Sequence, residues 1–553
     1  MALDNRDFIA YLNTLHNVNA NNSNAYAETN TTNPFFRKTM VERPVGQRLL
    51  RFLENSAPHM LILTGHAGDG KTGLLYQILQ PETMEPVGKA TMRNGAECVY
   101  VKDFSELDAL KRRDLLETCR NELQQGRHVF LVANTGPLIN AFGEMSSEQA
   151  RQLVGAIDDN KGDIQLYGQT PIAVVNVATL DNSQFVKPFL RNLLAEEMWR
   201  GCDMCAKKSY CPILRNRCLA RDFFERTTDF IEKRYIWQQE HGKKLTIRQI
   251  VAHLSYSLTG GLECGTVRDI PGKRFQYLFS NLFFGYQGVR IDRKASAIKA
   301  IGDILSEGHD RKRLRADEKL FIQGDFSAFP DEIRTSLQAE GDKEGYSERW
   351  QWAVRRAHML FSADADEKSR RELMEDVFSY WFLRYLSLTA DEDKPKSADH
   401  ELLQAALQMI FTGTVNGGDK ILITMNRDGG MTQNVQLVYD TIFRKKVKLR
   451  QKPISDFSAS SRYGLYLEME GKALPARISL PLLNYFEDIR KGIISTDIDP
   501  QLSQGIDSLR AQIIARCEVD DSTVSLAAMR RKGWEELSAT LEATPEGDRW
   551  IVE

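Results

Sequence analysis

The chain contains 553 residues, of which 42% are hydrophobic. One hydrophobic core stops growing well below this length, so we expect roughly two to four domains. The 73 Lys and Arg residues nearly balance the 75 Asp and Glu residues, and the formal net charge is -2. This balance excludes a whole-protein field that attracts nucleic acid or acidic membranes, so any such contact requires a local patch.

The start of the chain does not resemble an export signal. Residues 1–15 carry acidic side chains in an amphipathic pattern, whereas a secretion signal has a basic start and an apolar core. No apolar run approaches the roughly 18 residues that a membrane span requires. We therefore expect a cytoplasmic protein with no membrane contact. An N-terminal helix should be followed by a loop or linker at residues 16–34, which are rich in Asn, Thr, Ala and Ser.

The most specific motif lies between an apolar run at residues 60–63, which predicts a buried strand, and residues 72–79, which predict a helix. It satisfies the phosphate-binding pattern G-x-x-x-x-G-K-[ST]. The expected nucleotide-binding residues are Gly65, His66, Ala67, Gly68, Asp69, Gly70, Lys71, Thr72 and Gly73. Glycines let backbone N–H groups approach phosphate oxygens, and a helix N-terminus adds partial positive charge.

These residue types predict a nucleoside triphosphate, with ATP and Mg²⁺ as the expected cofactors. Lys71 should contact the β- and γ-phosphates, and the Thr72 hydroxyl should bind Mg²⁺. The alternative is a Gly-rich turn that only joins a strand to a helix.

Further strands are predicted in the same region. Apolar runs at residues 97–103, 128–134 and 171–176 alternate with helical runs such as residues 107–125. Such alternation predicts a parallel sheet with helices on both faces. The expected fold class is therefore an α/β P-loop NTPase core of the AAA-like (ASCE) type, in which ligands bind at the carboxyl ends of the strands.

Three polar residues at those strand ends join Lys71 and Thr72 as candidate catalytic residues. Asp103 could hold Mg²⁺ through water, or it could be a surface residue that caps the next helix. Asn134 and Asn176 could orient the attacking water or contact the γ-phosphate, or either could satisfy a turn. No apolar strand ends in the tandem Asp-Glu pair of efficient ATPases, so we expect slow or partner-dependent hydrolysis.

A cysteine cluster follows. Cys202, Cys205, Cys211 and Cys218 fall within 17 residues, and their spacing suits a structural, tetrahedral Zn²⁺ site. Free thiols, an iron–sulfur cluster and a redox pair are the alternatives. If Pro212 begins a helix, Cys211 and Cys218 lie about 10 Å apart along its axis, which strains a single site. Cys264, in a Gly-rich loop, is therefore a second candidate for the fourth ligand.

The rest of the chain changes from predicted helix to predicted strand. Residues 222–410 are mostly helical by pattern, with Thr246 as a helix N-cap and an interruption at residues 259–265. Strands are expected at residues 420–424, 435–439, 447–450, 463–470 and 476–480, with turns at 426–430 and 470–472 and a terminal helix at 525–542.

These patterns divide the chain into five expected parts. They are an N-terminal helix and linker (1–35), the P-loop core (36–200), a zinc knuckle with a helical lid (201–265), a helical domain (266–410) and a C-terminal β-rich α+β domain (411–553).

One predicted strand is basic. Residues 444–452 carry six positive charges, and Lys446, Lys448, Arg450 and Lys452 should share one face of a strand. Such a stripe could follow the phosphate backbone of DNA. Alternatively, the charges could serve solubility and discourage edge-to-edge pairing of the strand.

Several segments together resemble a known family. The segments LTGHAGDGKT, VYVKDFSEL, HVFLVANTG and VVNVATLD, followed by C-x2-C-x5-C-P-I-x2-N and LTIRQI…LTGG, resemble the DptF-type ATPases of bacterial phosphorothioation-dependent restriction and related phage-defence systems. The similarity spans roughly residues 40–265. It implies a P-loop ATPase that works with DptG- and DptH-like partners to restrict DNA without the host's phosphorothioate mark.

The chain departs from this family at one position. Related defence ATPases carry Asn-Glu-Gly where this chain has Asn134-Thr135-Gly136, and the missing acid puts independent catalysis in doubt. The leading expectation is an ATP-binding subunit of a DNA-targeting defence complex, with the nuclease or effector in another subunit and homo-oligomerisation left open. The alternatives are a signalling switch ATPase and a nucleotide-bound scaffold that recruits an effector without contacting DNA.

Overall fold

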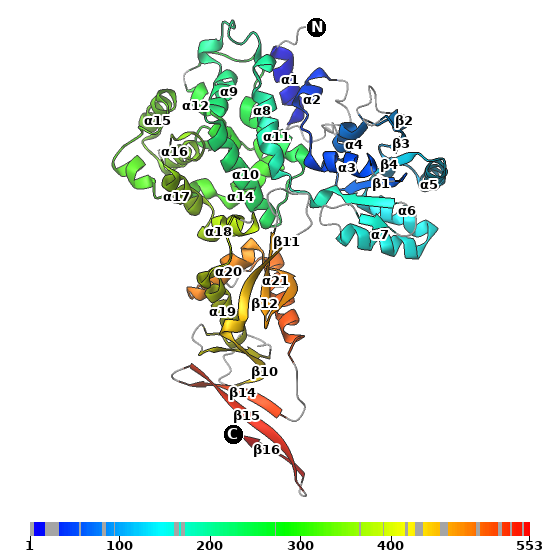
Figure 1. Cartoon of the computed structure of the whole chain (residues 1–553). Helices are drawn as coiled ribbons and strands as arrows, with labels where there is room; N and C mark the ends of the chain where they lie inside the picture. Colours follow the sequence, from blue (N-terminus) through cyan, green and yellow to red (C-terminus); the bar gives the residue numbers. More distant parts are fainter. Residues whose placement is uncertain are drawn as a thin grey trace. The chain divides into compact units, whose positions relative to one another are not determined.

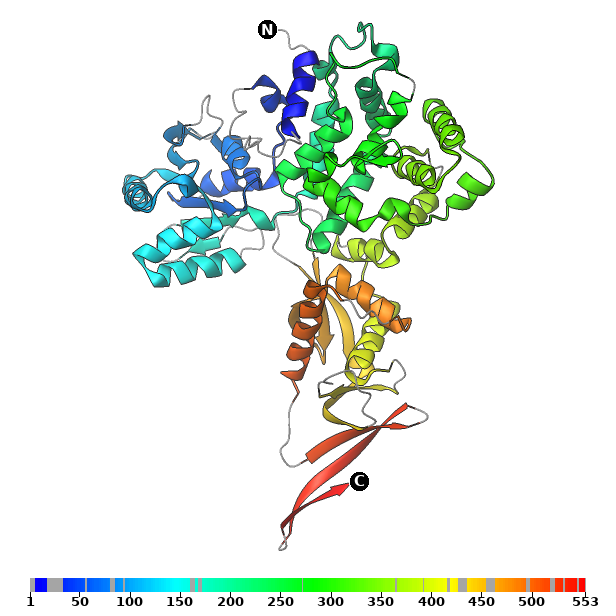
Figure 2. The same cartoon turned by 180° about the vertical axis from the view of Figure 1, so that it is seen from behind.

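The computed structural model describes residues 5–16, 33–54, 57–79, 85–92, 95–159, 165–167, 172–270, 272–363, 366–390, 392–414, 418–425, 435–453, 463–493, 498–517, 523–530, 533–544 and 547–552. They form two compact units (Figures 1 and 2). Described residues before 240 and within 243–378 form the N-terminal unit. Those within 240–242 and from 379 onwards form the C-terminal unit.

A six-stranded sheet organises the first part of the N-terminal unit, in the order β2-β3-β4-β1-β6-β5. The inner strands run parallel, and the edge strands β2 and β5 run antiparallel to their neighbours. The strands are β1 (Met60–Gly65), β2 (Val87–Thr91), β3 (Glu97–Val101), β4 (His128–Asn134), β5 (Gln165–Tyr167) and β6 (Ile172–Asn176). The predicted α/β core is confirmed. The two edge strands were missed because neither carries an apolar run.

Helices cover both faces of this sheet. One face packs against α3 (Pro44–Glu54) and α4 (Lys71–Leu79), and the opposite face packs against α5 (Ala109–Gln124), α6 (Thr135–Met145) and α7 (Ser147–Asp159). Successive strand residues point to opposite faces, so a strand between two helical layers buries both sets of side chains. All residues of β1 are accordingly buried, which explains its uninterrupted apolar sequence.

The rest of the N-terminal unit is mainly helical (Figure 1). Its helices are α1 (Asn5–Leu15), α2 (Pro34–Thr39), α8 (Val186–Leu194), α9 (Pro212–Asp222), α10 (Phe224–Glu240), α11 (Ile247–Thr259), α12 (Lys273–Gln276), α13 (Phe279–Phe283), α14 (Lys299–Glu307), α15 (Asp331–Glu344), α16 (Glu348–Phe361) and α17 (Glu367–Val377). A short hairpin joins β7 (Tyr286–Gln287) to β8 (Arg290–Ile291). As predicted, Thr246 caps α11, and it forms a reciprocal capping box with Gln249.

The C-terminal unit contains two antiparallel sheets. One has the order β11-β12-β13 and the other the order β16-β15-β14-β10-β9. The strands are β9 (Lys420–Thr424), β10 (Val435–Phe443), β11 (Val447–Pro453), β12 (Tyr463–Met469), β13 (Lys472–Arg477), β14 (Thr523–Arg530), β15 (Gly533–Thr544) and β16 (Gly547–Val552). The helices are α18 (Tyr380–Thr389), α19 (Ser397–Thr412), α20 (Leu480–Arg490) and α21 (Pro500–Ile514).

Two expectations for this unit are wrong. The terminal helix at residues 525–542 is absent, because β14 and β15 pair there as an antiparallel hairpin. The many Ala, Leu and Glu residues favour a helix locally, but pairing between strands overrides that preference. The strand expected at residues 476–480 begins and ends earlier as β13, and Leu480 instead opens α20.

One expected domain boundary differs from the division seen in the structure. The boundary between residues 410 and 411 falls inside α19, whereas the two units separate between residues 378 and 379. Most of the expected linker at residues 16–34 and the turn at residues 426–430 lie outside the described residues. In the described part of the chain, no helix combines the length and apolar character that crossing a membrane requires.

Candidate functional site

The predicted phosphate loop, which is called the phosphate loop below, lies between β1 and α4, at the carboxyl ends of the parallel strands. Gly68 and Gly70 adopt positive φ values of 87° and 82°, which side chains rarely tolerate. The start of α11 also packs closely on both glycines. An added Cβ would lie 3.1 Å from the Thr246 hydroxyl at Gly68 and 2.9 Å from Ile247 Cδ1 at Gly70. Backbone conformation and this approach both require glycine at these positions.

The carbonyl groups of the loop are held by other parts of the unit. Lys71 Nζ donates to Gly65 O (3.1 Å) and to His66 O (2.8 Å). Arg248 N donates to Gly68 O (3.2 Å), and Arg43 Nη1 donates to Asp69 O (3.0 Å). In a trans peptide, the C=O and the following N–H point in opposite directions. Fixing these carbonyls therefore presets the direction of the loop's N–H groups.

Asp69 and Arg43 hold the loop through hydrogen bonds. Asp69 is only 2% exposed, and its carboxylate accepts a hydrogen bond from His66 N (2.8 Å). Arg43 Nη2 donates to Asn182 Oδ1 (3.1 Å). Burial lowers the pKa of Arg43 to about 10, while the charges of Asp69 and Asp181 act in the opposite direction. Arg43 is therefore protonated at neutral pH and balances the buried Asp69 carboxylate.

Lys71 and Asn134 meet across neighbouring strands. Gly65 at the end of β1 pairs in register with Asn134 at the end of β4. Lys71 is 8% exposed, and its ammonium donates to Asn134 Oδ1 (2.9 Å). Asn134 N in turn donates to Ser105 Oγ (2.6 Å). The structure thus brings together the phosphate-loop lysine and one of the strand-end polar residues that the sequence singled out.

The other strand-end candidates have different surroundings. Asp103 follows β3 and makes no side-chain cap bond to the 3-10 turn Phe104–Glu106, while Asp108 caps α5. Helix capping therefore does not account for Asp103. Asn176 lies in register with Thr64 of β1, but its Oδ1 accepts a hydrogen bond from Ala178 N (3.1 Å). Asn176 satisfies a turn, which is one of its two predicted roles.

Sequence reasoning missed Arg43 and Asn182. Asn182 Nδ2 donates to Leu245 O (2.9 Å), so the two side chains join α3, the phosphate loop and the segment before α11. Neither residue belongs to a recognisable motif. The only local signal is that Arg43 precedes Pro44, at the first position of α3, and could therefore have been expected at a helix start.

The predicted metal ligands fall into two groups. The thiols of Cys202, Cys205 and Cys211 all act on Cys264, whose pKa is raised to about 11 by burial first and then by these three neighbours. Cys218 lies in α9, about two helical turns after the N-cap residue Cys211. Within the described ranges, no three His, Cys, Asp or Glu side chains stand as a ready-made metal-ligand group.

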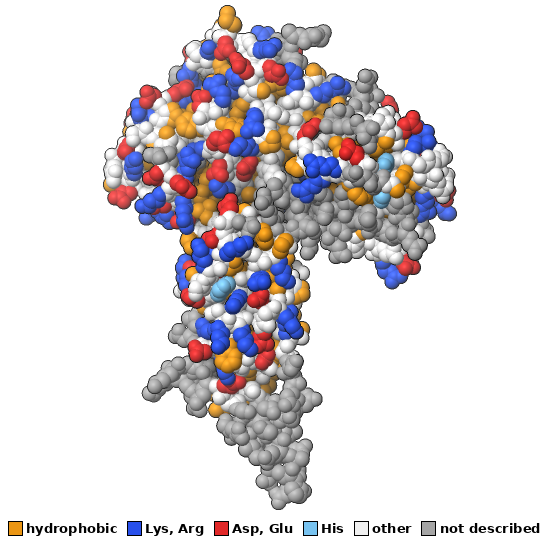
Figure 3. Space-filling view, viewed as in Figure 1, with side chains coloured by type: hydrophobic (Ala, Val, Ile, Leu, Met, Phe, Trp, Pro, Cys, Tyr) orange, Lys and Arg blue, Asp and Glu red, His pale blue; other side chains and the backbone are white. Residues whose placement is uncertain are grey.

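Three of the four basic residues lie on one face of β11 as the alternation predicted, whereas Lys446 ends the 3-10 turn Arg444–Lys446 before the strand. Val447 and Leu449 are buried, whereas Lys448, Arg450 and Lys452 are exposed. Acidic partners accompany two of the basic side chains, since Lys446 contacts Glu470 (2.7 Å) and Arg450 contacts Glu468 (3.4 Å). On the face seen in Figure 3, basic and acidic side chains are interspersed over the described part of the C-terminal unit.

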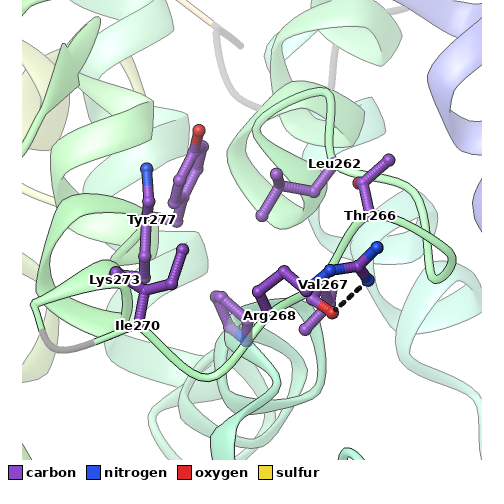
Figure 4. Close-up of a pocket in the computed structure, with 8 residues that line it drawn as sticks. Leu262, Thr266, Val267, Arg268, Ile270, Lys273 and Tyr277 are labelled. Carbon is purple, nitrogen blue, oxygen red and sulfur yellow. Dashed lines mark hydrogen bonds between the residues drawn. The ribbon is translucent and has the colours of Figure 1, made fainter.

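A separate cavity of about 240 Å³ lies in the helical part of the N-terminal unit (Figure 4). It is lined by Pro212, Leu262, Thr266, Val267, Arg268, Ile270, Lys273 and Tyr277. None of these residues belongs to the phosphate loop, and the lining is largely apolar. The cavity borders the loop that carries Cys264 and shares no residue with the predicted nucleotide site.

Comparisons with known proteins add no relative: the chain matches no protein-family model, no curated protein and no solved structure.

Proposed function

We propose that the chain is an ATP-binding P-loop subunit in which Lys71 and backbone amides within residues 65–73 enclose the triphosphate, apart from the amides of His66 and Asp69, which bond within the loop. The observation that supports this proposal is the anchoring of the loop carbonyls, which limits the directions that its N–H groups can take. A loop of this kind at a helix N-terminus suits an anion. A preset site loses less conformational entropy when ligand binds. Lys71 is held among oxygen acceptors beside Asn134, at the position where its ammonium would meet the outer phosphates.

The magnesium ion would be held by Thr72 and, through water, by Asp103. Thr72 is the second residue of α4, beside the loop. Strand β3, which precedes Asp103, is separated from β1 by β4 alone. This strand order supports the AAA-like (ASCE) assignment, in which one strand separates the phosphate-loop strand from the strand that precedes the Mg²⁺-binding acid. When bound, Mg²⁺ would neutralise charge on the β- and γ-phosphates.

Hydrolysis is proposed to be slow or to depend on a partner. The strand-end residue in contact with Lys71 is an amide, Asn134, and the next residue is Thr135. An amide can orient water through hydrogen bonds, but it cannot accept the proton of that water as a carboxylate can. A partner subunit could supply the missing group.

The proposed setting is a bacterial DNA-targeting defence complex with DptG- and DptH-like partners and with its nuclease or effector in another subunit. The exposed basic residues of β11 are the proposed DNA contact. The acidic partners of Lys446 and Arg450 favour a second candidate function, a nucleotide-dependent switch or scaffold that binds only proteins. A basic side chain paired with an acidic one adds no net charge to the surface, so the attraction to a phosphate backbone is weaker.

Nucleotide binding can be tested by titrating the full chain with a fluorescent ATP analogue in the presence of Mg²⁺. Replacing Lys71 with Ala should weaken binding by at least about tenfold, because a charge-assisted hydrogen bond contributes roughly 1.5–3 kcal/mol. Lys111→Ala, in the exposed first turn of α5, is the matched control and should bind normally. An absence of measurable affinity in the unmodified chain would overturn the proposal.

The DNA-targeting complex and the protein-binding switch or scaffold can be distinguished by DNA binding at different salt concentrations. Replacing Lys448 and Arg450 with Gln should weaken DNA binding for every sequence tested and reduce the slope of log affinity against log salt by about 0.9 per lost phosphate contact. Lys319→Gln and Lys368→Gln in the N-terminal unit, both exposed, form the control pair. A protein that binds nucleotide but shows no DNA affinity at low salt would support the switch or scaffold.

A further inference from the structure

We propose that Cys202, Cys205, Cys211 and Cys264 together bind one structural Zn²⁺, and that Cys218 is not a ligand. Nucleotide binding does not enter this proposal, because the four cysteines lie outside the phosphate loop. The site would fasten the loop before α9 to the loop after α11.

The backbone already brings these two loops together. Lys207, between Cys205 and Cys211, donates from Nζ to Cys264 O (2.8 Å) and to Gly265 O (3.2 Å). The segment that carries three cysteines is thus hydrogen-bonded to the segment that carries the fourth. A turn also closes between the first two, since Cys205 N donates to Cys202 O (3.2 Å). A C-x2-C turn of this kind presents two thiolates to one ion.

The neighbourhood and chemistry of the four groups suit zinc. Cys211, Cys202 and Cys205 each act on the Cys264 thiol, so the four side chains belong to one neighbourhood. Four cysteine sulfurs form a closed tetrahedral set for Zn²⁺, and a bound divalent ion keeps coordinated thiols deprotonated.

Cys211 has the surroundings of a metal ligand. It is the N-cap residue of α9, directly before Pro212 at the first position of the helix. The partial positive charge of a helix N-terminus also favours the thiolate.

The helix excludes Cys218 from this group. Cys218 lies seven residues after Cys211 in α9, which corresponds to about 10 Å along the axis. The four proposed ligands come from three places in the chain: the Cys202–Cys205 turn, Cys211 and Cys264. In a site that included Cys218, one ion would have to reach two cysteines that are two helical turns apart.

The sulfur atoms must still move to reach the ion. They do not form a closed ligand group as they stand in the described residues. Rotation between staggered rotamers about the Cα–Cβ bond shifts a cysteine sulfur by about 3 Å without moving the backbone. Cys205 is exposed and Cys211 and Cys264 are partly exposed, so neighbouring side chains leave room for such rotation. A closed Cys₄ set has no open coordination position, so the ion would be structural.

The test is the metal content of the full chain, purified without added chelator and measured by mass spectrometry of the elements. The unmodified chain should hold one zinc, and replacing Cys218 with Ser should leave that content unchanged. Cys264→Ser and Cys205→Ser should each lose most of the metal. Cys119→Ser, in the buried part of α5, is a further control that should retain it.

A second measurement separates ligand loss from unfolding. Cys205 is exposed, so its replacement removes no packing, and the Cys205→Ser variant should keep the circular-dichroism spectrum of a folded chain. Co²⁺ exchanged into the unmodified chain should give the intense visible bands of a tetrahedral thiolate site. A chain without zinc, zinc retained by Cys264→Ser, zinc lost from Cys218→Ser, or a disulfide among these cysteines would each overturn the proposal.

Discussion

At the scale of single residues, Arg43 connects the phosphate loop to parts of the N-terminal unit that carry no motif. Its guanidinium donates to Asp69 O and to Asn182 Oδ1, while its backbone N donates to Gln77 Oε1 (2.9 Å) of α4. In turn, Gln77 Nε2 donates a hydrogen bond to Arg43 O (3.0 Å). One residue therefore ties together the loop, the helix that follows it and Asn182.

We expect Arg43→Ala to weaken ATP binding by about tenfold, because it releases the Asp69 carbonyl and leaves the Asp69 carboxylate buried without its counter-charge. Arg43→Lys should recover little of the loss, since an ammonium lacks the planar fork that reaches two acceptors. Affinity for the fluorescent ATP analogue is the measurement. Arg51→Ala, exposed on α3, which Arg43 precedes, should bind normally, and equal losses in both variants would contradict the proposed role of Arg43.

Asn134 is the second residue with a testable role. Its side chain contacts the Lys71 ammonium, so the outermost phosphate of a triphosphate would arrive beside both groups. Replacing Asn134 with Ala should lower ATP affinity by about three- to tenfold, the effect of one lost hydrogen bond, and should change ADP affinity less than about twofold. Isothermal titration with both nucleotides measures the difference.

Asn176→Ala provides the comparison for that result. Its amide oxygen is engaged by Ala178 N, so we expect ATP and ADP affinities to fall together or not at all. If Asn134→Ala also weakened both nucleotides equally, Asn134 would act only as a support for Lys71 and would not distinguish the γ-phosphate.

At the scale of elements, the start of α11 forms one wall of the phosphate loop. Arg248 N donates to Gly68 O, and Thr246 and Ile247 lie against the two glycines that have positive φ values. The position of these groups depends on how α11 begins. The Thr246 hydroxyl accepts from Gln249 N (3.3 Å), and Gln249 Oε1 accepts from Thr246 N (2.8 Å). A helix cap therefore helps to shape the proposed nucleotide site.

Replacing Thr246 with Ala should destabilise the N-terminal unit by about 1 kcal/mol, the usual cost of losing an N-cap. We also expect a several-fold loss of ATP affinity, because Arg248 N is presented by the first turn of the same helix. Thr246→Ser, which keeps the hydroxyl, should restore both properties. Thermal unfolding and nucleotide titration of the three proteins provide the measurements. If the Thr246→Ala variant were destabilised but bound ATP with unchanged affinity, the cap would not contribute to nucleotide binding.

The elements that could be predicted from the sequence are those specified by local patterns. The phosphate loop, the strand β4 and the Thr246 cap depend on residues close together in the chain. The hairpin β14–β15 could not be predicted in the same way, because its helix-favouring residues become strands only through pairing with each other and with β10. Arg43 and Asn182 were missed for the same reason, since their partners lie far away in the sequence.

At the scale of the whole molecule, the stability of the fold should depend on pH through a carboxyl group remote from the loop. Glu232 in α10 is partly buried, and burial raises its pKa to about 7. The charge of Asp229 on the same helix and, more weakly, that of Asp181 add to the rise. The charge and backbone amide of Lys187 in α8 oppose it. The folded chain therefore holds a proton on Glu232 over a range in which the unfolded chain has released it.

The sign of the effect follows from proton linkage. Between the ordinary pKa of 4.5 and the folded value of about 7, the folded state binds more protons than the unfolded state, so stability falls as pH rises. We expect Glu232→Gln to raise the unfolding free energy at pH 8 by on the order of 1–3 kcal/mol, after allowance for partial exposure, and to change it little at pH 4.5. Thermal unfolding of both proteins across this range measures the difference. Glu144→Gln, exposed on α6, should show no such dependence, and a Glu232→Gln effect that is constant with pH would mean that packing, and not the proton, is responsible.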